Sequence, residues 1–255
     1  MVTSRTSVSY EVHGATAVVS IAEPESRNAL SPRVFRGLQC ALDSAAEDGV
    51  RSLVLTGEGR TFCAGGDLTA VNAALGGDVE ADLGEMVDDL HRIIRSLRAL
   101  PFPTVAAVNG SAVGAGIALA LACDVRVMAR SAAFVTGYLA VGATPDGGAS
   151  FHLARALGTS QAVASFLLNK RIGTEELARL GLVDEVVDDG ATLDAATTIA
   201  DKLSELSPQA VSATRELVYG ATSRTLSDHL DAERSAFLKV ARTDGFREGV
   251  APFAR

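Results

Sequence analysis

The chain has 255 residues, of which 47% are hydrophobic and 21% are charged, and its formal net charge is −8. This composition excludes a mainly disordered chain, and the length allows one large domain or a domain with an appendage. A net negative charge argues against a nucleic-acid-binding surface, which needs a basic face, so we expect no nucleic-acid partner.

The first third of the chain predicts strands interleaved with helices. Residues 8–12 and 15–21 have the composition of strands and flank His13-Gly14, a pair typical of a hairpin turn. Ser31-Pro32 predicts a helix start, with serine as the N-cap and proline in the first helical position. A short strand, a loosely ordered surface segment and a helix are then expected in turn, at 52–56, 68–84 and 85–100.

No charged residue lies between Arg98 and Asp124, a gap of 25 residues that is long enough for a membrane-spanning helix. Two prolines and the turn pair Asn109-Gly110 divide the gap into short pieces, so we expect no membrane segment. The better interpretation is a buried strand at 104–108 followed by a helix of small residues at 114–122. Buried parallel strands are apolar without alternation.

The rest of the chain predicts two further strands and then helices alone. The strands are expected at 125–128 and 133–136, and the helices at 148–157, 160–167, 174–179, 194–206, 208–220 and 225–242. This order is typical of an α/β core with a helical appendage. We place the core in residues 1–200 and a C-terminal helical region in residues 201–255.

The cysteines and the N-terminus bear on metal binding and compartment. Cys40, Cys63 and Cys123 are too few and too scattered for a disulfide framework or a zinc site, and we expect no metal. The first seven residues lack the apolar core of a signal peptide, so we expect a cytoplasmic protein.

Three segments combine glycine and small residues with a predicted strand end or helix start, at 61–68, 109–116 and 144–150. Small residues there let a ligand approach backbone N–H groups, and a helix N-terminus favours negative charge. Two such amides from separate loops would make an oxyanion hole, whereas each segment taken alone is also typical of an ordinary turn. Gly114-Ala115-Gly116 lacks the third glycine of a dinucleotide-binding loop, which excludes that class.

Asp146 is the only formally charged residue from Ser131 to Ala154. A lone carboxylate in apolar surroundings tends to have a raised pKa, which suits it to proton transfer near neutral pH. The alternative is that Asp146 caps the helix predicted after it. The residues alone leave both interpretations open.

A series of five motifs runs along the chain, at 27–31 (RNALS), 62–68 (FCAGGDL), 106–116 (AAVNGSAVGAG), 122–126 (ACDVR) and 181–187 (GLVDEVV). In this order and spacing they resemble the crotonase superfamily, the enoyl-CoA hydratase/isomerase family. The resemblance covers nearly the whole chain, and the motifs together are highly specific.

The resemblance implies an α/β fold built as a spiral of ββα units, with C-terminal helices that assemble a homotrimer or a dimer of trimers. It implies an acyl-CoA thioester substrate, with coenzyme A as part of that substrate and no separate cofactor. By motif position, the N–H groups of Gly66 and Ala115 would hold the thioester oxygen. Substrate contacts would come from residues in and around the motifs: Arg27, Ala29, Ala64, Asp67, Leu68, Gly114 and Tyr138.

The departures from the family pattern are informative. The two glutamates that family hydratases use to add water fall here at Ala118 and Tyr138, and neither residue can do that chemistry. For Tyr138 we expect packing on the acyl chain rather than a hydrogen bond. Asp146 lies where several family isomerases, and also the 4-chlorobenzoyl-CoA dehalogenases, place a catalytic aspartate.

These matches predict an enoyl-CoA isomerase in which Gly66 and Ala115 stabilise a thioester enolate and Asp146 moves the proton. The alternatives are a hydratase-like activity, a CoA-ester hydrolase or decarboxylase, a dehalogenase, and a non-catalytic acyl-CoA-binding homologue.

Overall fold

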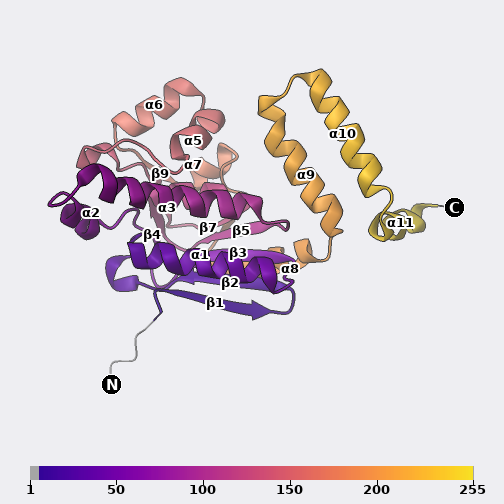
Figure 1. Ribbon diagram of the computed structural model, residues 1–255, viewed down its shortest axis with the longest axis horizontal. Coiled ribbons are helices and arrows are strands. Elements are labelled where there is room, and N and C mark those ends of the chain that lie inside the picture. Colours follow the sequence, from indigo (N-terminus) through magenta and orange to yellow (C-terminus); the bar gives the residue numbers. More distant parts are fainter. Residues whose placement is uncertain (1–5, 255) are drawn as a thin grey trace.

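Two β-sheets carry the fold of the computed structural model, which describes residues 6–254; most of the segment considered for a signal peptide lies outside that range. The larger sheet has six strands in the order β1-β2-β3-β5-β7-β10 (Figure 1). They are β1 (Val8–His13), β2 (Thr16–Ile21), β3 (Ser52–Gly57), β5 (Thr104–Val108), β7 (Val125–Ala129) and β10 (Glu185–Val187). The smaller sheet has the order β4-β6-β8-β9, formed by β4 (Thr61–Cys63), β6 (Ser111–Val113), β8 (Ala133–Val135) and β9 (Arg171–Gly173).

Helices follow the strands along the chain and then continue alone. They are α1 (Pro32–Glu47), α2 (Leu68–Ala74), α3 (Val79–Ala99), α4 (Ala115–Ala122), α5 (Ala149–Leu157), α6 (Thr159–Leu167), α7 (Thr174–Arg179), α8 (Thr192–Ser204), α9 (Pro208–Gly220), α10 (Leu226–Val240) and α11 (Asp244–Val250). As predicted, Ser31 is the N-cap of α1, and its side chain accepts a hydrogen bond from the Val34 N–H.

The central strands of the larger sheet, β2, β3 and β5, are buried on both faces. Leu53 and Leu55 of β3 pack in one apolar cluster with α1, α3 and α4, whereas Val54 packs in a second cluster with Ala196 and Ala200 of α8. From β2 to β10 the strands are parallel, and only β1 is antiparallel to its neighbour. Burial on both faces explains why these strands are apolar without alternation.

Long and short strands alternate along the chain in a repeating unit. β3 leads into β4, β5 into β6, and β7 into β8, so each of these three strands of the larger sheet is followed by one of the smaller sheet. A helix follows each such pair, namely α2, α4 and α5. This arrangement confirms the predicted α/β fold with its spiral of ββα units.

Asn28 and Asn109 hold the turn between β3 and β4. Asn28 is fully buried, and its φ of 58° lies in the left-handed region. The two side-chain amides donate to main-chain oxygens of the turn: Asn28 to Glu58 (2.9 Å) and Thr61 (2.7 Å), Asn109 to Gly57 (2.7 Å) and Gly59 (2.9 Å). The asparagine in the 27–31 motif is therefore a structural residue that fixes where β4 begins.

The long uncharged stretch becomes β5, β6 and α4. All eight residues of α4 are buried, so this helix lies in the centre of the protein and has no solvent-facing side. Within residues 6–254, no helix is long and apolar enough to cross a membrane.

The segment 68–84, expected to be loosely ordered, is mostly helical. Asp67 caps α2 by accepting hydrogen bonds from the Thr69 and Ala70 N–H groups, and Asp78 caps α3 through the Ala81 N–H. The prediction was wrong because each segment begins with an aspartate that caps a helix. α3 therefore starts at Val79, six residues before the predicted start.

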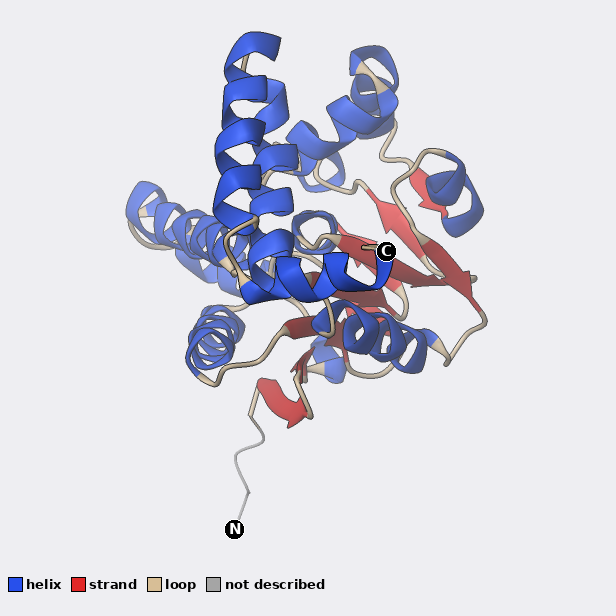
Figure 2. Cartoon of the chain, turned by 90° about the vertical axis from the view of Figure 1, so that its right-hand side faces the viewer, coloured by secondary structure: helices blue, strands red, loops and turns tan. Residues whose placement is uncertain are grey.

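The C-terminal helices lie beside the core (Figure 1) and in front of the strands in Figure 2. Arg215 of α9 pairs with the Asp124 carboxylate at 3.0 Å, and the Tyr219 hydroxyl donates to the same carboxylate. The Arg98 guanidinium lies 3.2 Å from the centre of the Tyr219 ring. These contacts fix α9 to the core. The helix before it, α8, packs on the larger sheet. The predicted domain boundary at residue 200 falls inside α8 and stays a prediction.

Candidate active site

The loop at 64–68 runs beside residues 27–30. Three main-chain hydrogen bonds join them: Ala64 N–H to Arg27 O (3.0 Å), Leu30 N–H to Gly65 O (2.7 Å) and Asp67 N–H to Leu30 O (3.2 Å). Leu30 and Gly66 thus form a parallel bridge. In such a bridge Leu30 bonds to the residues on either side of Gly66, so the N–H of Gly66 points away from Leu30 and is available to a ligand.

A second available amide lies at the start of α4. Ala115 is the first residue of this helix, and an N–H in that position has no partner within its own helix. Gly114, just before it, has φ 51° and ψ −118°, a conformation that glycine adopts without strain. The helix dipole adds partial positive charge at this end, which favours a developing oxyanion.

Two glycines let these loops touch. A Cβ added to Gly65 would lie 2.7 Å from the Val113 carbonyl oxygen, and one added to Gly116 would lie 2.5 Å from the Cys63 carbonyl oxygen. Side chains do not fit at such distances, so both positions require glycine. The loops that carry Gly66 and Ala115 are consequently in backbone contact, as an oxyanion hole built from two loops requires.

The residue next to Asp146 packs on the helix that begins at Ala115. That residue is Gly147, and a Cβ added there would lie 2.8 Å from the Ala118 Cβ and 3.0 Å from Leu90 Cδ2. Ala118 follows Ala115 by three residues, which is close to one turn of the helix. The structure therefore brings all three predicted catalytic residues to one region.

The surroundings of Asp146 shift its ionisation. Burial raises the pKa of the Asp146 carboxyl above its ordinary value, and this is the largest influence on it. The Tyr138 hydroxyl, which donates a 3.0 Å hydrogen bond to Asp146 Oδ1, and the charge of His91 lower the same pKa and offset part of the rise. A partly desolvated carboxylate with one bound donor is suited to accept and return a proton.

Asp146 does not cap the helix after it. The N-cap of α5 is Gly148, with no side-chain capping hydrogen bond, and the Ala149 N–H donates to the main-chain oxygen of Asp146 instead. The helix-cap interpretation is therefore wrong for the side chain, which bonds to Tyr138.

Tyr138 does more than pack. Its side chain is buried, and its ring centre lies 6.1 Å from that of Phe166 at an interplanar angle of 53°. Contrary to the expectation of packing alone, its hydroxyl binds Asp146, and burial with the nearby carboxylate raises the Tyr138 pKa. A lone tyrosine carries no sequence signal for this partner, because the pairing depends on the path of the chain between residues 138 and 146.

Three further side chains surround the site. His91 of α3 lies near enough to Asp146 for its charge to affect the carboxyl pKa. It was not predicted as a site residue, because the sequence does not show that α3 passes Asp146. The Cys63 Sγ accepts the Gly65 N–H at 3.4 Å, and burial raises the pKa of its thiol to about 12, which agrees with a structural role. His152 has its pKa lowered to about 4 by burial and by Arg98, Arg126 and Arg155, so it is neutral at pH 7.

The predicted substrate-binding residues line the same loops with unequal exposure. Arg27 is exposed and has φ 57°, Leu68 is exposed, and Ala29 is buried. The Asp67 carboxylate caps α2, so its side chain has a structural role at the start of that helix. Of the predicted substrate-binding residues, Asp67 directly follows Gly66 and Gly114 directly precedes Ala115, so these two are next to the two amides in the chain.

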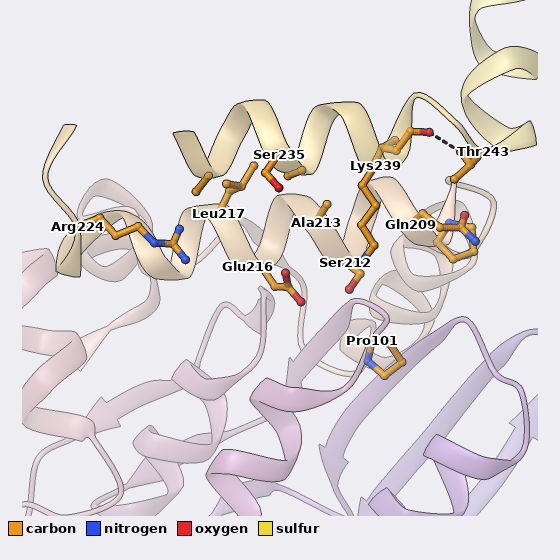
Figure 3. A pocket seen from close by; sticks show the side chains of 14 residues that line it. Pro101, Gln209, Ser212, Ala213, Glu216, Leu217, Arg224, Ser235, Lys239 and Thr243 are labelled. Atoms are coloured by element: carbon orange, nitrogen blue, oxygen red, sulfur yellow. Dashed lines mark hydrogen bonds between the residues drawn. The ribbon is translucent and has the colours of Figure 1, made fainter. Parts of the chain in front are cut away.

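A large cavity lies elsewhere. It measures about 570 Å³ and is lined by α9, α10 and the loop at Pro101, where Ser212, Glu216 and Lys239 turn toward one space (Figure 3). None of the predicted catalytic or substrate-binding residues lines it. Among the described residues 6–254, no group of three or more His, Cys, Asp or Glu side chains is placed to hold a metal ion.

Two sheets joined in repeated ββα units define a fold of the crotonase type. The family model described as enoyl-CoA hydratase/isomerase matches residues 11–255, and the chain belongs to that family.

Known proteins of the family match over nearly their whole length. A "Probable enoyl-CoA hydratase" of Rhodobacter capsulatus is 36% identical over 246 residues, covering 96% of this chain and 94% of that protein. A 1,2-epoxyphenylacetyl-CoA isomerase of Escherichia coli is 34% identical over 244 residues, covering 95% and 93%. The crystal structure of an enoyl-CoA hydratase from Polaromonas sp. JS666 superposes with a TM-score of 0.93 at 39% identity, covering 96% of each chain.

Proposed function

We propose that this protein is an enoyl-CoA isomerase in which Asp146 carries the proton. The observation that supports this most is the Asp146 carboxylate next to Gly147, which packs on α4: Asp146 is partly buried, its pKa is raised, and Tyr138 holds one of its oxygens. The positions that carry glutamates in family hydratases hold Ala118 and Tyr138.

The two loop amides would bind the thioester oxygen. Within residues 6–254, Gly66 N–H and Ala115 N–H have no main-chain partner, and charge grows on the thioester oxygen when the neighbouring carbon loses a proton. Amides aimed at the oxygen stabilise the transition state more than the ground state, an effect worth about 3–4 kcal/mol for a single donor in other enzymes.

Asp146 would move the proton. The carboxylate takes a proton from the carbon next to the thioester carbonyl, so a C–H bond breaks, an O–H bond forms and the electron pair enters the enolate. The same proton then returns to the far end of the conjugated enolate, which shifts the double bond and regenerates the carboxylate. No atom is gained or lost, so the step needs no oxidant, metal or separate cofactor.

The coenzyme A moiety of the substrate would lie along the loop 64–68 and residues 27–30. Arg27 and Leu68 are exposed there, and Ala29, Ala64 and Gly114 are small enough to let the ligand approach the backbone. A charged Arg27 side chain suits an anionic coenzyme A, which the net charge of the chain would otherwise repel.

We also propose a homotrimer or a dimer of trimers. Exposed apolar side chains gather on the C-terminal helices, where Leu226 is 75%, Leu230 53% and Phe237 61% exposed. Burying such side chains between copies would stabilise an assembly. Light scattering coupled to size-exclusion chromatography tests this, and a monomeric mass would contradict it.

A panel of CoA thioesters tests the activity. Isomerisation of a 3-enoyl-CoA leaves the product mass unchanged and moves the double bond, hydration adds one water, and hydrolysis releases free coenzyme A. We expect the first outcome. Hydration is the second candidate, supported by relatives that are named hydratases, and a product heavier by one water from a 2-enoyl-CoA would favour it.

A further inference from the structure

Tyr138 connects the two halves of the candidate active site. Its ring lies beside Gly114, where an added Cβ would be 3.7 Å from ring atoms Cε1 and Cζ, and its hydroxyl reaches Asp146. Gly114 directly precedes the amide of Ala115. One buried side chain therefore contacts both the start of α4 and the carboxylate.

The hydroxyl of Tyr138 engages one carboxylate oxygen only. It donates to Asp146 Oδ1 at 3.0 Å, and the main-chain oxygen of Asp146 is farther away, at 3.5 Å. Within residues 6–254, Tyr138 is the only side chain that donates a hydrogen bond to the Asp146 carboxylate. Because a phenol has one proton to donate, the Tyr138 hydroxyl holds Oδ1 alone, and Oδ2 receives no hydrogen bond from another side chain of residues 6–254.

We propose that Tyr138 is a positioning residue for the proton transfer assigned to Asp146: it fixes Oδ1, so that Oδ2 is the oxygen that takes and returns the proton. This inference rests on the proposed function. It gives the hydroxyl a role that packing on an acyl chain would not require, because packing needs only the ring.

The chemistry of the pair fits this role. Burial keeps the Tyr138 hydroxyl protonated, and a donor bound to the charged form of a carboxylate favours that form. The other titratable groups near the pair are His91 of α3, Cys63 of β4 and His152 of α5. His152 is neutral at pH 7 and the Cys63 thiol is protonated, while the charge of His91 lowers the Asp146 pKa.

Tyr138→Phe keeps the ring and removes the hydroxyl. We expect kcat to fall about tenfold to a hundredfold while KM changes less than twofold, since an unanchored carboxylate spends less time in the productive orientation. The acid limb of the kcat profile should move to higher pH, because the lost hydrogen bond had favoured the carboxylate. A carbon-13 titration of the Asp146 carboxyl should show the same upward movement without any substrate.

Tyr10→Phe is the matched control. The Tyr10 hydroxyl donates to Asp48 Oδ2 at 2.9 Å on the edge strand β1, far from the three glycine-rich segments in the sequence, so its loss removes an equivalent bond outside the site. This variant should keep kcat, KM and the Asp146 titration unchanged.

An unchanged Asp146 titration in Tyr138→Phe, or an unchanged kcat in an active enzyme, would overturn the proposal. If the wild type turned over no thioester, the proposed function would fail by itself, while the substrate-free titration would still decide whether Tyr138 holds the carboxylate.

Discussion

Gly147 packs directly on Ala118, so closely that an added Cβ would lie 2.8 Å from the Ala118 Cβ. This contact places the backbone next to Asp146 against the helix whose first amide is that of Ala115. The position of the carboxylate relative to the amides thus depends on a glycine that no catalytic step uses.

Replacing Gly147 by alanine should destabilise the protein and displace Asp146. We expect the free energy of unfolding to fall by about 3 kcal/mol, of which about 1 kcal/mol comes from φ +56° and the rest from overpacking against Ala118 and Leu90. Urea denaturation measures the change. Gly142→Ala is the control: its φ is +74° with nothing within 4 Å, so it should cost about 1 kcal/mol only, and equal losses would contradict the packing account.

Gly116→Ala should separate the two loops that carry the amides. The new Cβ would lie 2.5 Å from the Cys63 carbonyl oxygen, and we expect kcat/KM to fall about a hundredfold, the scale of losing one oxyanion donor. Gly249→Ala, in α11 with nothing within 4 Å, should leave kcat/KM unchanged. Equal activity of both variants would show that contact between the loops is not needed.

The raised pKa of Asp146 predicts how stability depends on pH. Between the ordinary carboxyl pKa of about 4 and the higher folded value, the folded state binds more protons than the unfolded state, so Asp146 makes stability fall as pH rises through this window. Asp146→Asn removes this contribution. The melting temperature of the variant minus that of the wild type should therefore rise from pH 4 to pH 8, and a difference that fell with rising pH would contradict the sign.

His152 should titrate far below a free histidine. Its folded pKa of about 4 lies below the unfolded value of about 6.5, so stability should fall as pH drops through that interval. Proton NMR, with His152→Gln to assign the signal, should show one imidazole with a midpoint near 4. A midpoint near 6.5 would show that Arg98, Arg126 and burial do not act on it.

The sequence predicted the fold well where local chemistry decides it. Ser31-Pro32 starts α1 as expected, and the uncharged stretch becomes β5 and α4, because turn pairs, caps and apolar runs act over a few residues. The helical structure of segment 68–84 was missed. Its helices start at capping aspartates, which were not recognised as helix starts in the sequence.

The candidate site was predictable only in part. The two amides follow from motifs on the chain, and Asp146 from its isolation among uncharged residues. The bond from Tyr138 and the approach of His91 depend on how separate elements pack, which no spacing within one segment reveals.

The most direct measurement is the rate at which wild type and Asp146→Asn move the double bond of a 3-enoyl-CoA, followed by proton NMR, with thioester binding measured in parallel by calorimetry. The proposed mechanism predicts turnover by the wild type, a loss of at least about a hundredfold in the variant, and similar binding by both. Equal rates for the two proteins would contradict the assignment of Asp146 as the proton carrier.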